Sequence, residues 1–293
     1  MKDVLGLITA LLVMLAAAVP ARAADGKIAL VAAENFYGNV AQQIGGDRVS
    51  LTSILNSPDQ DPHLFEVSPA IVRRIAAAQI VVYNGADYDP WMEQLLTVTP
   101  KPGRVVIIAA DLVDKKAGDN PHIWYDPATM PAVARALAAA LTAADPARKD
   151  DYAARLKTFL ASLEPLNEKL AAIRSKYAGV TVAASEPVFG YMAAALKLQM
   201  RNERFQLAVM NDTEPSARDI VAFEQDLRTH QVRVLFYNKQ ASDKLVQRLV
   251  DLARASNIPV VGVTETCPPG TSYQDWMMSE LDDAEKALAG PPP

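Results

Sequence analysis

The chain has 293 residues, 50% of them hydrophobic, and its 29 basic and 34 acidic residues give a net charge of −5. This composition is typical of a globular protein with one large or two medium domains, and the lack of a basic stripe argues against nucleic acid as a partner. The single cysteine, Cys267, excludes an internal disulfide.

Residues 1–23 have the pattern of a cleavable secretory signal. Lys2 precedes an uncharged apolar run from Val4 to Val19, and the small-x-small sequence ARA ends at Ala23. The alternative is a transmembrane anchor, but the run is short for a bilayer span. No cysteine stands at the cleavage site for a lipid anchor. We therefore expect a soluble, periplasmic protein, exported through a cleavable signal peptide.

Strand and helix patterns then alternate along the first part of the chain. The predicted strands are 27–33, 48–55, 79–85 and 104–110, and the predicted helices are 35–47, 68–78 and 89–96. Alternation of this kind favours a parallel sheet with helices on both faces.

The middle of the chain has no strand pattern. Residues 145–177 have helical periodicity over 33 residues, which would extend roughly 50 Å as one helix, and Pro165 would kink it. A helix of that length between two α/β halves predicts a rigid connector.

The alternation resumes after the connector. The predicted strands are 180–185, 205–210, 232–238 and 259–265, and the predicted helices are 187–198, 216–230, 242–257 and 272–290. The predicted fold class is α/β, with two lobes of mainly parallel sheets joined by one long rigid helix. The expected divisions are a signal peptide (1–23), an N-terminal lobe (24–135), a helical linker (136–177) and a C-terminal lobe (178–290).

Four side chains capable of binding a metal follow predicted strands. His63 in DPHLF and His122 in NPHIW are two of only three histidines, and each follows a proline. Glu186 and Glu265 come at the ends of strands in the second half. Because open α/β sheets bind ligands at the carboxyl ends of their strands, two residues from each lobe would meet in the cleft.

This set suits a divalent cation. Two neutral imidazoles and two carboxylates carry a charge of −2. Proline before each histidine stiffens its loop, and Pro187 would place Glu186 at a helix N-terminus, where the ionised carboxylate is favoured. Taken singly, each residue has a plainer interpretation, as an exposed loop histidine, a helix cap or a solvated strand-end charge.

Three further features have structural interpretations. We expect His230 to interact with the C-terminal end of its helix, and Cys267 to be a small buried group, although it could also be a soft ligand. Trp124 and Tyr125 are expected to brace the His122 loop by packing.

At these motifs the sequence resembles the cluster A-I substrate-binding proteins of bacterial ABC importers for zinc and manganese, over almost the whole mature chain. The resemblance rests on the four segments DPHLFEVSPAIVRRIAAAQIVVYNG, NPHIWYDP, ASEPVFGYMAAAL and VTETCPP. It implies two α/β lobes joined by a long helix, one metal ion between the lobes, and delivery of that ion to a membrane permease. By position it implies the metal ligands His63, His122, Glu186 and Glu265.

The sequence departs from the family pattern at two points. Glu265 stands where aspartate is usual, and the segment KKAGDN is short and lacks the histidine-rich loop of many zinc members. Glutamate at 186 makes the donor set harder, which favours Mn²⁺ slightly over Zn²⁺, with Fe²⁺ as a further candidate, although zinc binds most such sites more tightly.

The favoured function is a monomeric, non-enzymatic metal-binding protein for import. One alternative is an exported metal-dependent hydrolase, but no H-E-x-x-H motif and no obvious additional base accompany the four residues. A binding protein for an organic ligand is the other alternative, and it would need an aromatic or polar pocket instead of metal donors.

Overall fold

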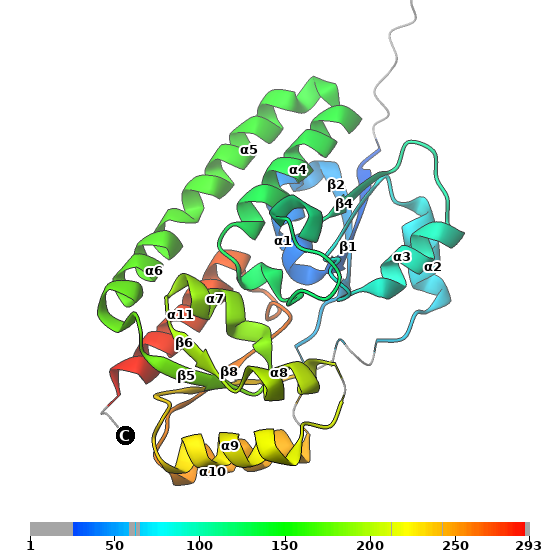
Figure 1. Cartoon of the computed structure of the whole chain (residues 1–293). Coiled ribbons are helices and arrows are strands. Elements are labelled where there is room, and N and C mark those ends of the chain that lie inside the picture. The colour runs from blue at the N-terminus through cyan, green and yellow to red at the C-terminus, as the bar shows by residue number, and fades with distance from the viewer. Residues whose placement is uncertain (1–25, 59–61, 63–64, 212, 242, 291–293) are drawn as a thin grey trace, which may run out of the picture.

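The computed structural model describes residues 26–58, 62, 65–211, 213–241 and 243–290. The predicted signal segment, residues 1–23, lies outside the described residues. Two four-stranded parallel sheets, one above the other in Figure 1, form the two halves of the molecule. The predicted fold class is confirmed, and the predicted lobe boundaries stay a prediction.

The first sheet has the strand order β2-β1-β3-β4, with every pair parallel. Its strands are β1 (Ile28–Glu34), β2 (Val49–Leu55), β3 (Ile80–Tyr83) and β4 (Val105–Ile108), and its helices are α1 (Asn35–Gly45), α2 (Pro69–Ala77) and α3 (Pro90–Val98). Apart from Glu34 at the end of β1, both central strands are apolar, and they are almost wholly buried, as expected for a sheet covered on both faces.

The second sheet repeats this order as β6-β5-β7-β8, again parallel throughout. Its strands are β5 (Thr181–Ala184), β6 (Gln199–Arg201), β7 (Leu235–Asn238) and β8 (Val260–Val263). The accompanying helices are α7 (Gly190–Ala195), α8 (Glu203–Met210), α9 (Ala217–Arg228), α10 (Lys244–Ala255) and α11 (Tyr273–Ala289).

One predicted strand is wrong. Residues 205–210 form most of helix α8, and the edge strand is the shorter β6 immediately before it. Phe205 is buried and packs edge-on against Phe223 of α9, with ring centroids 5.0 Å apart. Burial of this aromatic residue between two helices outweighs a run of residues that also suits a strand.

The connector consists of α4 (Thr129–Ala144), α5 (Lys149–Ser162) and α6 (Glu164–Tyr177). The predicted long helix is interrupted at Leu163, two residues before Pro165, because proline has no N–H to donate to the carbonyl four residues earlier. In Figure 1, α5 and α6 run in line along one side of both halves, and α6 packs against α11.

One continuous hydrophobic core joins the two halves. The cluster contains β1 and α1 residues from the first half and α11 residues from the second, together with α4 and α6 of the connector. Smaller clusters lie beneath α2 and α3 and beneath α9 and α10. Across the described ranges, no helix is both long enough and apolar enough to cross a membrane.

Candidate metal centre

Loops at the carboxyl ends of the strands carry the candidate ligands. His122 directly precedes the 3₁₀ turn Ile123–Tyr125 in the connection from β4 to α4, Glu186 follows β5, and Glu265 follows β8. In both sheets the strand order reverses beside the first strand of the lobe, which is where open α/β sheets form their ligand-binding crevice.

His122, Glu186 and Glu265 form one buried cluster. Their ligand atoms all lie within 4.8 Å of one another, and the residues are 0%, 3% and 0% exposed. Nε2 of His122 lies 3.6 Å from Oε2 of Glu265. One imidazole nitrogen and two carboxylates converging at this spacing are a donor set that can hold a metal ion.

The hydrogen bonds around Asn120 define the tautomer of His122. Asn120 donates from Nδ2 to the carbonyl of Pro187 at 2.7 Å, so its Oδ1 faces the histidine and accepts from the His122 backbone N–H at 3.1 Å. The same Oδ1 lies 2.7 Å from His122 Nδ1, which must therefore carry the proton. In the neutral ring that a metal ligand requires, Nε2 then keeps its lone pair and directs it into the cluster.

His122 Nε2 is a buried acceptor that lacks a hydrogen-bond partner among the described residues. A buried polar atom in this state costs free energy unless something completes its bonding. With the proton on Nδ1, the 3.6 Å approach to Glu265 brings two electron-pair donors together. A cation between them would satisfy both.

Neutral donors hold the two carboxylates in place. Asn238, at the end of β7, donates from Nδ2 to Oε2 of Glu186 at 2.7 Å and to Oε1 of Glu265 at 2.6 Å. The hydroxyl of Tyr88 donates to Oε2 of Glu265 at 2.8 Å. These donors orient the carboxylates without cancelling their charge, so a divalent cation would still gain two negative partners.

The structure brings together the three predicted ligands that lie among its described residues. His122, Glu186 and Glu265 share one cluster, whereas His63 lies outside the described residues. Cys267 is not in the cluster. It is buried, and its thiol bonds to the carbonyl of Thr271 at 3.3 Å. The buried interpretation of Cys267 is therefore confirmed.

Pro187 begins only a three-residue 3₁₀ turn before the short helix α7. The long helix expected to favour an ionised Glu186 is therefore reduced to one turn and a short helix. The amide of Asn238 supplies the donor instead. His230 is exposed and has a left-handed backbone, with φ of 53° directly after α9.

Sequence reasoning missed the residues that hold the ligands. Asn238 and Tyr88 follow predicted strands as the ligands do, but they lack the charge or imidazole that drew attention to those positions. Asn120 had a detectable signal, because an asparagine two residues before a histidine can turn back to bond its backbone and ring. The bracing role of Trp124 is confirmed, since its ring is fully buried and contacts that of His122 edge-on.

A second pair of buried acids, Glu34 and Asp89, lies in the first half. Glu34 ends β1 and is 0% exposed, and Asp89 is 1% exposed. Asp89 accepts from the backbone N–H groups of Asn84 at 2.7 Å and Gly85 at 2.8 Å. Burial, and then the charge of Asp89, raises the pKa of Glu34 well above its usual range. Burial raises the pKa of Asp89 to about 7, against the lowering effect of its backbone hydrogen bonds.

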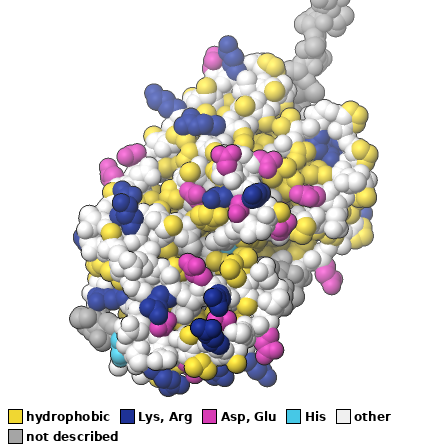
Figure 2. Space-filling view, in the orientation of Figure 1, with side chains coloured by type: hydrophobic (Ala, Val, Ile, Leu, Met, Phe, Trp, Pro, Cys, Tyr) yellow, Lys and Arg dark blue, Asp and Glu magenta, His cyan; other side chains and the backbone are white. Residues whose placement is uncertain are grey.

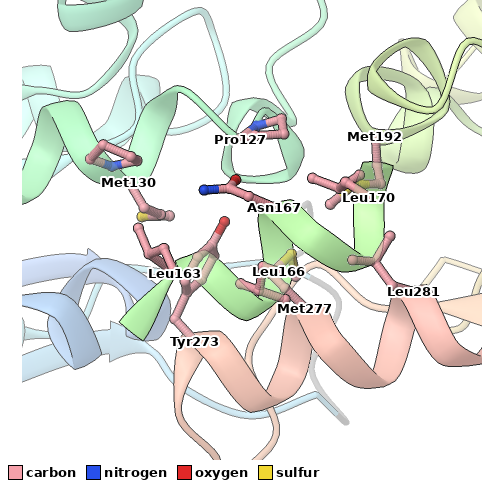
Figure 3. Close-up of a pocket in the computed structure, with 11 residues that line it drawn as sticks. Pro127, Met130, Leu163, Leu166, Asn167, Leu170, Met192, Tyr273, Met277 and Leu281 are labelled. Atoms are coloured by element: carbon pink, nitrogen blue, oxygen red, sulfur yellow. The ribbon is translucent and has the colours of Figure 1, made fainter. Parts of the chain in front are cut away.

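An apolar cavity of about 100 Å³ lies between the connector and α11. Leucine, methionine and proline side chains dominate its wall in Figure 3, and Asn167 and Tyr273 are its polar members. The hydroxyl of Tyr273 donates to the carbonyl of Trp124 at 2.9 Å. The cavity contains no carboxylate or imidazole, so it is not where a metal would bind.

Charged side chains on the molecular surface are interspersed. On the face shown in Figure 2, basic and acidic groups alternate over both halves without a large field of one sign. The acids that could attract a cation into the centre are the buried ones, Glu186 and Glu265.

Comparison with known proteins identifies the family. The family model described as zinc-uptake complex component A, periplasmic, matches residues 30–287. The chain belongs to this family. A putative metal-binding protein of Treponema pallidum is 27% identical over 90% of this chain and 88% of its own length. The manganese ABC transporter substrate-binding lipoprotein PsaA of Streptococcus mitis is 24% identical over 91% of each.

The fold of this zinc-uptake component family member matches a solved structure. The periplasmic zinc-binding protein TroA from Treponema pallidum superposes with a TM-score of 0.76, covering 90% of this chain and 100% of its own, at 18% identity. At that identity the match shows the shared fold alone. The chemistry of this chain rests on its own buried cluster.

Proposed function

We propose that this chain is the exported binding component of an ABC importer and captures one divalent transition metal ion between its lobes. His122, Glu186 and Glu265 bind the ion, with His63 as the fourth ligand carried by the resemblance. Manganese and zinc are the first candidates, and ferrous iron is a third.

The supporting observation is Nε2 of His122, which has no hydrogen-bond partner among the described residues and faces two carboxylates inside a buried cluster. A hydrogen-bonded network built only for stability rarely leaves a buried acceptor in this state. The family assignment and the relatives named for manganese and zinc support the same interpretation.

Donor type alone does not select one metal. Two carboxylates suit manganese or ferrous iron, whereas the general order of affinities places zinc above both at a nitrogen and oxygen site. Because both effects act at this site, the choice between the metals depends on the geometry that the protein imposes on the two carboxylates.

The remaining features follow from export and delivery. Residues 1–23 act as a cleaved signal, and the mature chain works as a monomer that passes its ion to a membrane permease. Lobes at residues 24–135 and 178–290, with the linker between them, enclose the site.

The proposal is tested by native mass spectrometry of the chelated protein offered equal Mn²⁺, Zn²⁺ and Fe²⁺. One bound ion is expected, and His122→Ala should weaken binding at least tenfold, about 1.4 kcal/mol. His230→Ala is the matched control, because it removes an exposed imidazole outside the cluster. Absence of a bound ion, or equal binding by both variants, would overturn the proposal. Metal-dependent hydrolysis that His122→Ala abolishes would instead favour the hydrolase.

A further inference from the structure

Asn238 stands between the two carboxylates of the centre. It is 1% exposed, and its single Nδ2 group donates to Glu186 Oε2 at 2.7 Å and to Glu265 Oε1 at 2.6 Å. An amide nitrogen carries two hydrogens, so each carboxylate receives one.

The orientation of this amide is set by its surroundings. Its Oδ1 accepts from the backbone N–H of Gln240 at 3.0 Å, so the opposite side of the amide, Nδ2, must face the carboxylates. The backbone of Asn238 is fixed in turn, because β7 pairs with β8 and its N–H donates to Ser185 Oγ at 3.2 Å. Rotation of the amide would exchange favourable bonds for contacts between acceptors.

Gln240 extends the same support to Glu265. Its Oε1 accepts from the backbone N–H groups of Glu265 at 2.7 Å and Thr266 at 3.0 Å. Asn238, at the end of β7, and Gln240, just after it, therefore hold the carboxylate and the backbone of Glu265. The carboxylate geometry is built into the second sheet before any ion arrives.

We propose that Asn238 determines the metal specificity of the centre by restricting Glu186 and Glu265 to coordination through one oxygen each. This inference rests on the proposed function. Coordination through both oxygens of either carboxylate would bring the cation onto the oxygen that already accepts from Asn238, in competition with a charge-assisted hydrogen bond in a buried site.

The restriction sets the coordination number. With His63, which the proposed function adds as the second imidazole, two imidazoles and two single oxygens would supply four donors, the number that zinc takes in proteins. The same four residues would supply six donors if both carboxylates were bidentate, which suits manganese and its preference for octahedral oxygen-rich sites. Asn238 thus favours zinc at a site whose donor types alone do not select one metal.

The experiment compares wild type with Asn238→Ala and with Asn238→Leu, which removes the donors while filling most of the space. X-ray absorption of the zinc-loaded proteins measures coordination number, and competition titration measures the ratio of zinc to manganese affinity. Wild type should show four nitrogen or oxygen donors and both variants five or six. The ratio should move toward manganese by about tenfold, the value of one hydrogen bond to a charged group.

Asn211→Ala makes the same change at an exposed position after α8 and should leave both readouts unchanged. If Asn238→Ala does not fold, Asn238→Leu still gives both readouts. Metal-loaded variants with the wild-type coordination number and affinity ratio would overturn the role of Asn238 while leaving the proposed function intact. A wild type that binds no metal would instead remove the proposed function itself.

Discussion

The buried pair Glu34 and Asp89 predicts an unusual dependence of stability on pH. Neither carboxylate oxygen of Glu34 has a hydrogen-bond partner among the described residues, and burial, then the charge of Asp89, raises the pKa of Glu34 well above its usual range. Ionising both buried carboxyls would place two like charges away from water, so one of the two keeps a proton. Asp89 already accepts two backbone N–H bonds and is the better anion, so Glu34 keeps the proton.

The sign and size of the effect follow from proton counting. Below about pH 4.3 Glu34 is protonated in both the folded and the unfolded chain. Between that pH and the raised pKa of the folded chain, only the folded chain keeps the proton, so its stability contribution is lost as the pH rises, by at most about 1.4 kcal/mol per pH unit. Glu34→Gln keeps a donor toward Asp89 but has no proton to lose, so its free energy of unfolding should lack this slope.

Urea unfolding of chelated wild type and Glu34→Gln at several pH values from 5 to 8 measures how the free energy of unfolding of each depends on pH. Titrating groups away from Glu34 and Asp89 contribute equally to both proteins and cancel. Glu168→Gln, on the exposed face of α6, is the matched control, because water surrounds that side chain in both states. If the free energies of unfolding of wild type and Glu34→Gln change with pH in parallel, Glu34 is already ionised in the folded chain and keeps no proton there.

Two further substitutions test how the centre is held. Asn120→Ala removes the group that fixes the tautomer of His122, so we expect a 10- to 100-fold loss of metal affinity in calorimetry, with folding retained; unchanged affinity would refute the tautomer argument. Asn35→Ala removes two hydrogen bonds to the backbone of Cys267, at 2.6 and 2.9 Å, and should lower the free energy of unfolding by about 1–3 kcal/mol. An unchanged urea midpoint would show that the hydrogen bonds between Asn35 and Cys267 contribute nothing to the free energy of unfolding.

The periodicity of apolar residues predicted most of the fold, because most helices and strands bury one face and therefore carry a regular apolar pattern. The alternation of strands and helices in both halves, and the strand-free connector, are all present. The failure at 205–210 has a physical cause. A six-residue apolar run suits a strand or a helix equally, and the contact of Phe205 with Phe223 decides it. That partner is distant in sequence and invisible to a local pattern.

The candidate centre was predictable to the extent that its residues carry distinctive chemistry. His122, Glu186 and Glu265 could be selected by type and by their positions after strands. Asn238 and Tyr88 could not, because neutral side chains after strands are common and their importance depends on which atoms they face. Local sequence indicates where a ligand can be. It does not indicate which neighbour will orient it.

Hydrogen bonds and core packing between the two halves limit how far the metal centre can open. Tyr125 in the first half donates to the carbonyl of Thr264 at 2.8 Å, directly before Glu265. Asn120 and Tyr191 hydrogen-bond across the other side, beside His122 and Glu186. The main core runs through both halves, so a wide hinge motion would expose apolar surface at about 25 cal/mol per Å². We therefore expect limited closure on binding, and expect affinity to come mainly from a site already assembled.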